Sequence, residues 1–439
     1  MLRRAATAVL AGSLLAAASA SIAAATSPGP LTARAETPPL FDDEAGGDAD
    51  ADDPAIWVDP LVRDASFFVA TAKNGGLRAY DFRGRELQSI PAPPPPAEDD
   101  AAGRFNNVDI AYGVRAGHRR VDLAVVTDRG RDQLRVYEIR PWARRLGLPP
   151  LVDRTAPDAP LVFSADQAEV NDQATAYGVT ASVRGGAADV YVSRRSRTAV
   201  ARLRLVPVPG GTFTYTTLGE VELPSTFTLP DGTDWSPCED PGDLPQVEGM
   251  VADTERGVVF LGQEDIGIWR ASLSLESPVL LQRVREFGVP GSYDPVEEEC
   301  VLDEDADPGF GGEHLAADVE GLTIYETRGR GGYLLASSQG DDTFAVYERP
   351  GETFLGSFEI ADGAFDGVQE SDGAAVTNVA VGSGFGRGVL VVQDGDNTPE
   401  VLDGDGEARG NTNFKVVAWP DVATRLGLAI DPTGAGPRT

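Results

Sequence analysis

The chain of 439 residues is poor in cysteine, histidine and basic side chains. It has two cysteines, two histidines and 37 lysines and arginines against 69 aspartates and glutamates, a formal net charge of -32. Neither cysteine is followed six residues later by the arginine of a cysteine-phosphatase loop, and neither His118 nor His314 stands in the Arg-His-Gly motif of histidine phosphatases. The charge argues against nucleic-acid binding, because such proteins neutralise phosphates with basic residues. It favours cation binding or simple solubility.

Long apolar runs are absent after the N-terminus. A basic start at Met1–Arg4 precedes the alanine-rich apolar stretch 5–25, which holds small-residue cleavage sites at Ala18–Ala20 and Ala23–Ala25. We interpret residues 1–25 as a secretory signal peptide; the alternative, a membrane anchor, is disfavoured by the short apolar core. We therefore expect a secreted (extracellular or periplasmic) protein without membrane association, with a flexible leader at 26–44, one folded domain at 45–430 and a C-terminal tail at 431–439.

One strand unit recurs six times along the chain. In its clearest copy, residues 246–269, a first strand reaches a turn at Asp253–Gly257, an apolar strand ends at Gln263–Asp265, and a third strand follows. The copies are spaced by roughly 50 to 75 residues. They begin near Asp53, Asn107, Tyr177, Gln246, Val319 and Asp372. A strand repeat of this period predicts an all-β fold, a six-bladed β-propeller.

The two cysteines lie in polar insertions of this repeat. Cys238 falls within Ser225–Leu244 and Cys300 within Gly288–Glu313. In an exported chain the two are expected to form a disulfide that ties the insertions together.

Three other polar stretches are interpreted as loops. Asp303–Asp307 resembles a calcium loop only in part, since Pro308 and His314 replace the glycine and closing glutamate of an EF-hand, so we expect a solvated loop. Asp403–Glu407 is interpreted as a turn, and Pro91–Pro96 as an exposed connector.

The residues that end the second strand of each unit differ between the two halves of the chain. The first three units offer Lys73, Arg129 and Arg194 or Arg195, and the last three offer Glu264, Gln339 and Asp394. Equivalent positions of a propeller share one end of its channel, so one half of that end should be basic and the other acidic. The first strands add more acids near the same face, namely Asp52, Asp53, Glu248, Asp318, Glu320 and Asp372. Crowded carboxylates require cations, and Ca²⁺ tolerates their irregular geometry best. A phosphate ester would suit both the metal ions and the basic half of this channel end.

At this point several motifs carry a resemblance. They run in order from about Asp48 to Leu426: Asp52–Trp57, Asn106–Ile110, Glu248–Asp253, Glu264-Asp265, Asp318–Tyr325, Ala336–Gly340, Gln393–Asn397 and Asn413–Lys415. Together these motifs resemble those of the β-propeller phytases. The resemblance implies a six-bladed propeller that removes phosphate from phytate (myo-inositol hexakisphosphate) with the help of several calcium ions. It implies a monomer whose partner is this small-molecule substrate, as its calcium complex.

The resemblance also implies roles for individual residues. Glu264, Asp53 and Glu248 would be catalytic, through a calcium-bound water that attacks phosphorus in line, without a phosphoenzyme. Four residues would bind substrate phosphate: Lys73, Arg129, Arg195 and Tyr177. With the strand-end comparison, the predicted calcium ligands are Asp52, Asp53, Glu248, Glu264, Asp318, Glu320, Gln339, Asp372, Asp394 and Asn397.

Two departures and two rival functions remain. After Arg195 the family often has an acid where this chain has Ser196, and the cysteine-bearing insertions are long. A calcium-dependent lactonase or arylesterase propeller would need a largely apolar substrate pocket, against which the set Lys73, Arg129 and Arg195 speaks. A propeller that only binds a ligand would not need both a carboxylate cluster and a basic wall.

Overall fold

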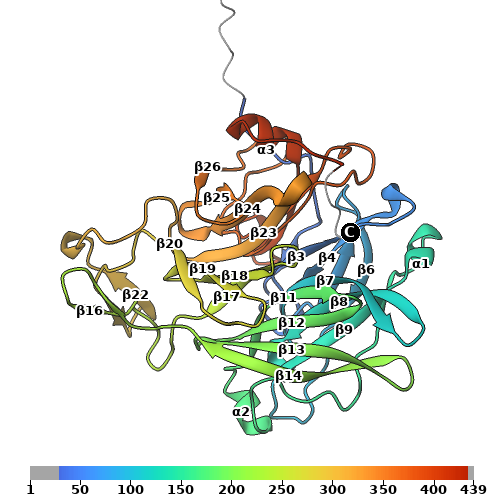
Figure 1. The fold of residues 1–439 in the computed structure, drawn as a ribbon, viewed down its shortest axis with the longest axis horizontal. Coiled ribbons are helices and arrows are strands. Elements are labelled where there is room, and N and C mark those ends of the chain that lie inside the picture. Colours follow the sequence, from blue (N-terminus) through green and yellow to red (C-terminus); the bar gives the residue numbers. More distant parts are fainter. Residues whose placement is uncertain (1–28, 434–439) are drawn as a thin grey trace, which may run out of the picture.

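The computed structural model describes residues 29–433, and within this range the strands form six sheets around a central axis (Figure 1). Strands β3, β7 and β11 lie near the centre of the view, and β14, β20 and β26 lie toward its rim. The predicted signal peptide (1–25) and most of the predicted tail (431–439) lie outside the described residues. Among the described helices, none is long and apolar enough to cross a membrane.

Each blade has the same strand order from the axis outward. The first three blades are β3 (Pro54–Trp57), β4 (Phe67–Thr71), β5 (Leu77–Tyr80) and β6 (Glu86–Ile90); β7 (Phe105–Ala116), β8 (Arg119–Asp128), β9 (Gln133–Ile139) and β10 (Leu151–Asp153); and β11 (Ala176–Arg184), β12 (Ala187–Arg194), β13 (Ala199–Val208) and β14 (Thr212–Glu222). The next two are β17 (Val247–Asp253), β18 (Val258–Gln263), β19 (Gly267–Ser272) and β20 (Val279–Arg283); and β23 (Val319–Thr327), β24 (Gly331–Ser338), β25 (Thr343–Glu348) and β26 (Phe354–Phe358). The predicted six-bladed β-propeller is confirmed.

The sixth blade joins the two ends of the described chain. Its inner strands are β27 (Ala374–Thr377), β28 (Val389–Asp394) and β31 (Asn411–Ala418), and its outermost strand is β1 (Ala35–Glu36) from the N-terminal side. β2 (Leu40–Phe41) also pairs with β31. Residues 26–28 of the predicted flexible leader (26–44) lie outside the described residues, and over 29–44 the prediction is wrong, because Leu31, Ala33 and Ala35 are buried and alternate with the two-residue period of a strand.

The second strand of each blade is the most apolar because neighbouring blades cover both of its faces. All of β4 and β28 is buried, whereas β6 at the outer edge is mostly half-exposed. The inner strands contact one another in a closed ring, β3 to β7, β11, β17, β23, β27 and back to β3. This closure leaves an axial channel whose two ends are lined by opposite ends of the same strands.

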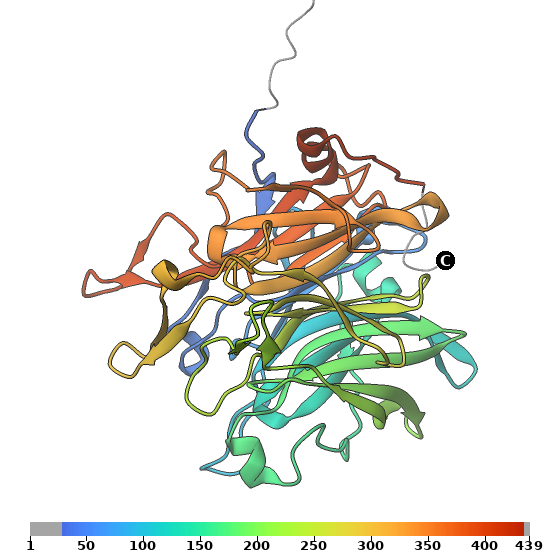
Figure 2. The same ribbon diagram turned by 60° about the vertical axis from the view of Figure 1, so that its left-hand side comes forward.

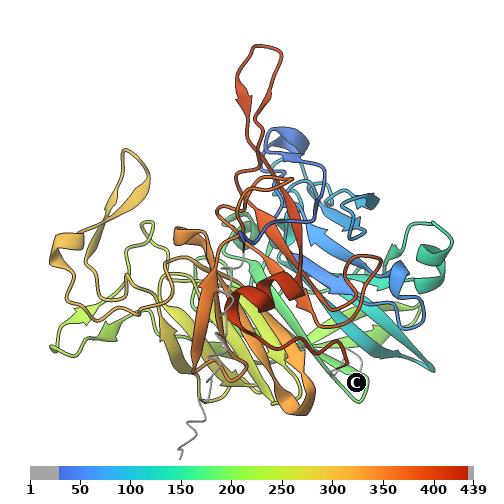
Figure 3. The same cartoon turned by 90° about the horizontal axis from the view of Figure 1, so that it is seen from above.

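Smaller elements stand outside the blades. They are the hairpins β15 (Phe227–Thr228) with β16 (Asp234–Trp235), β21 (Gly291–Asp294) with β22 (Glu299–Leu302), and β29 (Val401–Leu402) with β30 (Ala408–Arg409), the helices α1 (Pro141–Arg145), α2 (Gln167–Asn171) and α3 (Trp419–Leu426), and six single turns of 3₁₀-helix, η1 (Glu44–Gly46), η2 (Arg63–Ala65), η3 (Arg129–Arg131), η4 (Glu304–Ala306), η5 (Arg328–Arg330) and η6 (Gln339–Asp341). Figures 2 and 3 show the β29–β30 hairpin and the loops around β21–β22 projecting from the body. The stretch 303–307 is exposed, and Asp403 closes a turn by accepting the Asp405 and Glu407 amides, as predicted.

The predicted disulfide is present. Cys238 follows β16 and Cys300 lies in β22, with their Cα atoms 5.8 Å apart. It ties the two insertions to each other beside blades four and five.

Candidate active site

A repeated irregularity at the start of the inner strands builds one end of the channel. In β7, β11, β17 and β23 the pairing with the second strand skips two residues, Asn106-Asn107, Tyr177-Gly178, Glu248-Gly249 and Glu320-Gly321. Such bulges turn a side chain out of the regular alternation. In blades one and six the dipeptides Asp52-Asp53 and Asp372-Gly373 stand in the same place, directly before β3 and β27.

Glycine in these dipeptides lets neighbouring inner strands touch. A Cβ on Gly178 would lie 2.1 Å from the Glu248 carbonyl oxygen, and one on Gly249 would lie 2.0 Å from the Glu320 carbonyl oxygen. Any larger residue would push the blades apart. The glycines therefore allow the side chains that precede them to converge.

The convergence produces a compact carboxylate cluster, named here the Glu248 cluster. One carboxylate oxygen from each of Glu248, Glu264 and Glu320 lies within 4.8 Å of the others, and all three residues are buried. Asn106 Nδ2 donates to Glu248 Oε1 at 2.7 Å, and Gln246 Nε2 donates to Glu264 Oε2 at 2.9 Å. The second oxygens of Glu264 and Glu320 have no hydrogen-bond partner among the described residues.

Asp52 extends this cluster. It is 1% exposed, and neither of its carboxylate oxygens has a hydrogen-bond partner in the described part of the chain. Burial, reinforced by the charge of Glu248 and opposed by Lys73, raises the pKa of Asp52 well above its usual range. A buried carboxylate without a partner is costly, so this end of the channel has the donors and the electrostatic need for a cation.

The raised pKa values of the glutamates in the Glu248 cluster also favour a bound cation. Burial raises the pKa of Glu248 to about 7; the Asp372 charge adds to the rise, and hydrogen bonds from Tyr177 and Asn106 oppose it. Burial and the charge of Glu248 also hold the pKa of Glu264 and that of Glu320 well above the usual range. The donors are all oxygens in irregular positions, which suits a hard cation such as Ca²⁺.

A basic wall faces the cluster. Lys73 Nζ lies 3.4 Å from Asp372 Oδ2, and Gln339 Nε2 donates to Asp372 Oδ1 at 2.7 Å. Burial opposes the charge on Lys73, but the carboxylates of Asp372 and Asp52 outweigh it and raise the lysine pKa. This side chain remains charged beside the acids.

Arg129 carries the wall into blade two. Its guanidinium carbon lies 5.7 Å from the centre of the Tyr177 ring, and its Nε has no hydrogen-bond partner among the described residues. Burial and the neighbouring charge of Arg195 lower the pKa of Arg129 to about 10. Two arginines that crowd each other in a partly buried place favour an anion between them.

The backbone identifies the equivalent position of each blade. The residue after the second strand donates its amide to the segment before the inner strand: Arg129 to Arg104, Arg195 to Thr175, Glu264 to Gln246, Gln339 to Asp318 and Gly395 to Gln369. Arg195 is thus the member from blade three; Arg194 still lies in β12, where its Nε donates to the Ala174 carbonyl.

The same frame corrects the position of Asp394. Gly395, not Asp394, occupies the equivalent place in blade six, and a shift of one residue turns a strand side chain to the opposite face. Asp394 Oδ2 lies 3.1 Å from Lys415 Nζ, and Asn397 Oδ1 accepts from the same ammonium at 2.9 Å. Both residues thus lie beside Lys415 in blade six, and their role as calcium ligands stays a prediction.

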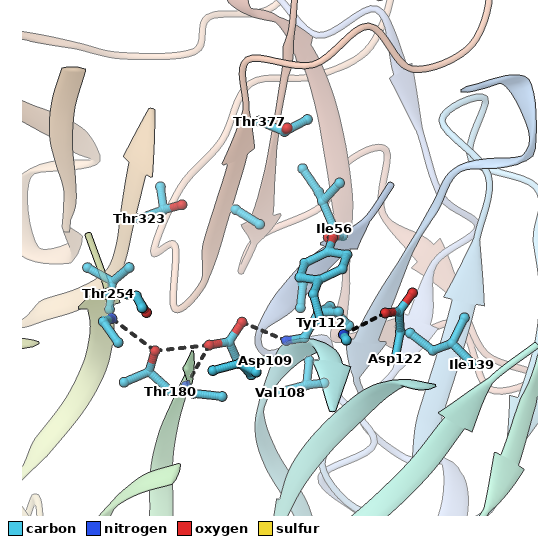
Figure 4. A pocket seen from close by; sticks show the side chains of 18 of the residues that line it. Ile56, Val108, Asp109, Tyr112, Asp122, Ile139, Thr180, Thr254, Thr323 and Thr377 are labelled. Carbon is cyan, nitrogen blue, oxygen red and sulfur yellow. Dashed lines mark hydrogen bonds between the residues drawn. The ribbon is translucent and has the colours of Figure 1, made fainter. Parts of the chain in front are cut away.

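Asp53 also differs from the prediction. Its Oδ2 accepts the Val108 amide at 3.0 Å, and Asp53 lines a cavity of about 1020 Å³ that runs along the inner strands. There Thr180 Oγ1 donates to Asp109 Oδ2 at 2.9 Å (Figure 4). Asp52 rather than Asp53 is the acid of this dipeptide that has unpartnered oxygens, so the structure favours Asp52 for the site.

The structure adds residues that the sequence reasoning missed. Asn106 and Gln246 orient two of the glutamates, and Ser196, where the family acid is lacking, donates its hydroxyl to Asp243 Oδ2 at 2.6 Å. The insertion therefore supplies an acid from elsewhere in the sequence. In the sequence, a site residue is repeatedly followed by glycine, and this recurring dipeptide was the signal that could have located the residues around the channel end.

Asp318 lies beside Glu264, next to Asp265. The Asp265 and Asp318 carboxyl groups lie beside each other, and Asp318 is close enough to raise the pKa of Glu264 after the effects of burial and Glu248. Of the predicted ligands, the structure thus gathers Asp52, Glu248, Glu264, Asp318, Glu320, Gln339 and Asp372 at one end of the channel, with Lys73, Arg129, Arg195 and Tyr177 beside them.

Comparison with known proteins agrees with this geometry. A family model described as Phytase matches residues 1–160 and 302–434. The curated 3-phytase of Bacillus subtilis (strain 168) is 31% identical over 407 residues, which are 91% of this chain and 86% of that protein.

Solved structures give only distant likenesses. Virginiamycin B lyase from Staphylococcus aureus is 12% identical with a TM-score of 0.37, covering 87% of this chain and 98% of its own. BBS1N, solved in complex with ARL6DN, is 10% identical with a TM-score of 0.40, covering 82% of this chain and 77% of its own. Likenesses this weak do not bear on function. On the family match and the identity to the curated relative, the chain belongs to the β-propeller phytases, a family of phosphate-ester hydrolases.

Proposed function

We propose that this phytase is calcium-dependent and hydrolyses phosphate monoesters of phytate to lower inositol phosphates and inorganic phosphate. The observation that carries the proposal is the meeting of the Glu248 cluster, with its unpartnered buried oxygens, and the basic wall of Lys73 and Arg129. A phosphate ester that also touches cations would satisfy both sides. The signal peptide at 1–25 and the C-terminal tail remain part of this proposal, with a propeller domain that begins at β1 rather than at residue 45, and the disulfide supports an oxidising, extracytoplasmic location.

Each side of the site has a distinct task. Glu248, Glu264 and Glu320 would hold the cation, with Asp52, Asp318 and Asp372 around them. Bound there, calcium would supply positive charge that activates water for in-line attack and draws in the phosphate oxygens. Lys73, Arg129 and Arg195 would hold the substrate phosphates in place for that attack. Their interactions with the negative charge that develops in the transition state would be stronger than those with the bound substrate, and this difference lowers the barrier.

Glu264→Gln tests this assignment. The variant keeps the size of the side chain and its bond to Gln246 but removes a charge that binds the cation. We expect kcat on phytate to fall by about a hundredfold or more, as for loss of a strong electrostatic stabiliser. The matched control is Glu348→Gln, an exposed glutamate on β25, which should leave kcat unchanged.

The assay is phosphate release from phytate and from a simple monoester, with and without calcium, with circular dichroism to confirm folding. Full activity after exhaustive chelation would disprove calcium dependence. A folded Glu264→Gln enzyme with wild-type kcat would disprove the metal assignment.

A further inference from the structure

Within the insertion Ser225–Leu244, the segment 236–242 is anchored at both ends. Before it, Trp235 packs on Phe287 with ring centres 4.7 Å apart and donates its indole N–H to the Val289 carbonyl at 2.7 Å. After it, the Leu244 amide donates to the Ser196 carbonyl at 3.2 Å, and Asp243 accepts the Ser196 hydroxyl. The segment thus spans from blade four to blade three, beside Arg195.

Cys238 fixes the middle of this segment. Its disulfide to Cys300 joins it to the β21–β22 hairpin, which is otherwise exposed. The residue directly after this bridge is Glu239, so its backbone is held between the disulfide and the Asp243 anchor.

Glu239 points toward the site rather than toward solvent. Its carboxyl group lies beside that of Asp265, and the Asp265 carboxyl group lies beside that of Asp318. The other oxygen of Glu239, Oε1, is buried and has no hydrogen-bond partner among the described residues. Asp265 directly follows Glu264, one of the three glutamates of the Glu248 cluster.

This row of acids needs a positive charge nearby. Ionised carboxylates in contact repel one another unless a cation neutralises them, and the number of ligand charges and the rigidity of a site set calcium affinity. Glu239 raises the local negative charge, and its tether limits how far it can retreat.

We propose that Glu239, held by the Cys238–Cys300 disulfide, is a positioning residue that braces Asp265 and Asp318 and increases the calcium affinity of the neighbouring Glu248 cluster. This inference rests on the proposed calcium dependence. It adds a residue from the insertion to the site and gives the disulfide a role in metal binding.

Calorimetric titration of the full secreted chain with calcium chloride tests it. Glu239→Gln, which is close to the native side chain in size, should weaken binding about tenfold, a change of about 1.4 kcal/mol. The matched control is Asp240→Asn, the next residue, which is exposed and should stay within about twofold of wild type. Glu264→Gln serves as the reference for loss of the cluster itself.

The outcomes separate the two proposals. Wild-type affinity in Glu239→Gln, alongside weakened binding in Glu264→Gln, would overturn this inference alone; calcium binding unaffected by Glu264→Gln would overturn the proposed metal site. Equal weakening by Glu239→Gln and Asp240→Asn would also overturn it, because it would reflect net charge only.

A second variant tests the tether. Cys238→Ser/Cys300→Ser keeps Glu239 but frees its segment, and we expect calcium affinity to fall by about threefold to tenfold, since the carboxylate is less well positioned. Thermal unfolding without calcium confirms that the variant is folded at the temperature of titration. Unchanged affinity in the folded variant would overturn the role of the disulfide.

Discussion

Two groups of carboxylates in this molecule differ in whether a positively charged side chain of the protein is paired with them. Around Lys415, which is fully buried, stand Glu36 at 2.8 Å and Asp394 at 3.1 Å, with Asp366 also paired to the ammonium. In the Glu248 cluster three glutamates meet within 4.8 Å, and no ammonium or guanidinium is paired with any of the three in the described part of the chain. One group is neutralised by a side chain of the folded protein, and the other has no such partner among the described residues.

The difference follows from which strand face each group occupies. Lys415 and Asp394 lie on neighbouring strands β31 and β28 and turn into the outer part of blade six, where Glu36 of β1 reaches them. Glu248 and Glu320 stand at the bulged starts of inner strands, Glu264 directly follows the second strand β18, and the three converge at one end of the channel. Closing the propeller therefore neutralises one group, and binding a metal would neutralise the other.

Breaking the Lys415 group should have the largest effect on stability. Lys415→Met leaves three buried or half-buried carboxylates without their ammonium, and removal of one partner of a buried ion pair costs about 3–5 kcal/mol. The free energy of unfolding in urea measures this loss. Lys415→Met/Asp394→Asn is the control, because it also removes an acid and should recover part of the loss. A single variant as stable as wild type would show that the buried ammonium is dispensable.

Binding of calcium to the Glu248 cluster should have the next largest effect on stability. Calcium at a hundredfold excess over its Kd should stabilise the folded protein by about 2.7 kcal/mol, because it binds only the folded state. The melting temperature with and without a chelator measures this effect. In Lys415→Met the calcium-dependent increment should persist, whereas in Glu264→Gln it should shrink. An equal increment in Glu264→Gln and wild type would place the stabilising ion elsewhere.

Removing one carboxylate should change the unfolding free energy in opposite directions in the two groups when calcium is absent. Glu320→Gln relieves repulsion within the cluster and provides an amide donor, so we expect a gain of roughly 1 kcal/mol in unfolding free energy without calcium. Asp366→Asn removes a partner of Lys415 and should destabilise. Denaturant melts in chelator compare the two variants. If Glu320→Gln proves destabilising without metal, the cluster is not under electrostatic strain.

A further effect concerns pH. Because the pKa of Glu248 is raised from 4.5 to about 7, the folded protein retains a proton that the unfolded chain has lost between these values. The unfolding free energy of the calcium-free protein should therefore fall as pH rises from about 4.5 to about 7. Melting temperatures across this window, with and without calcium, test the sign. Saturating calcium should reduce this fall, since it binds the ionised form; a fall unchanged by calcium would contradict the assignment.

The repeat, the disulfide and the division of one channel end into a basic half and an acidic half could be predicted from the sequence, because each depends on local patterns. Arg129 and Glu264 could be placed by counting to the end of an apolar strand. Asp394 could not, since it is the last residue of β28, as Asp128 is of β8, so the position equivalent to Arg129 belongs to Gly395 and a single step reverses the side chain. The choice of Asp52 over Asp53 likewise depends on a contact with Val108 in the next blade, and Glu239 on an insertion whose path no periodicity describes.

The burial of Lys415 and Lys73 among acids has a consequence for chemical labelling. These two are the only lysines in the sequence. Lys415 is inaccessible, and Lys73 is 23% exposed at the side chain and held protonated by its neighbours. Reagents that acylate free amines react with the neutral form, so the folded enzyme offers them almost no lysine target. Modification of Lys73 would instead report whether its carboxylate neighbours are occupied, which makes this one amine a covalent probe of the site.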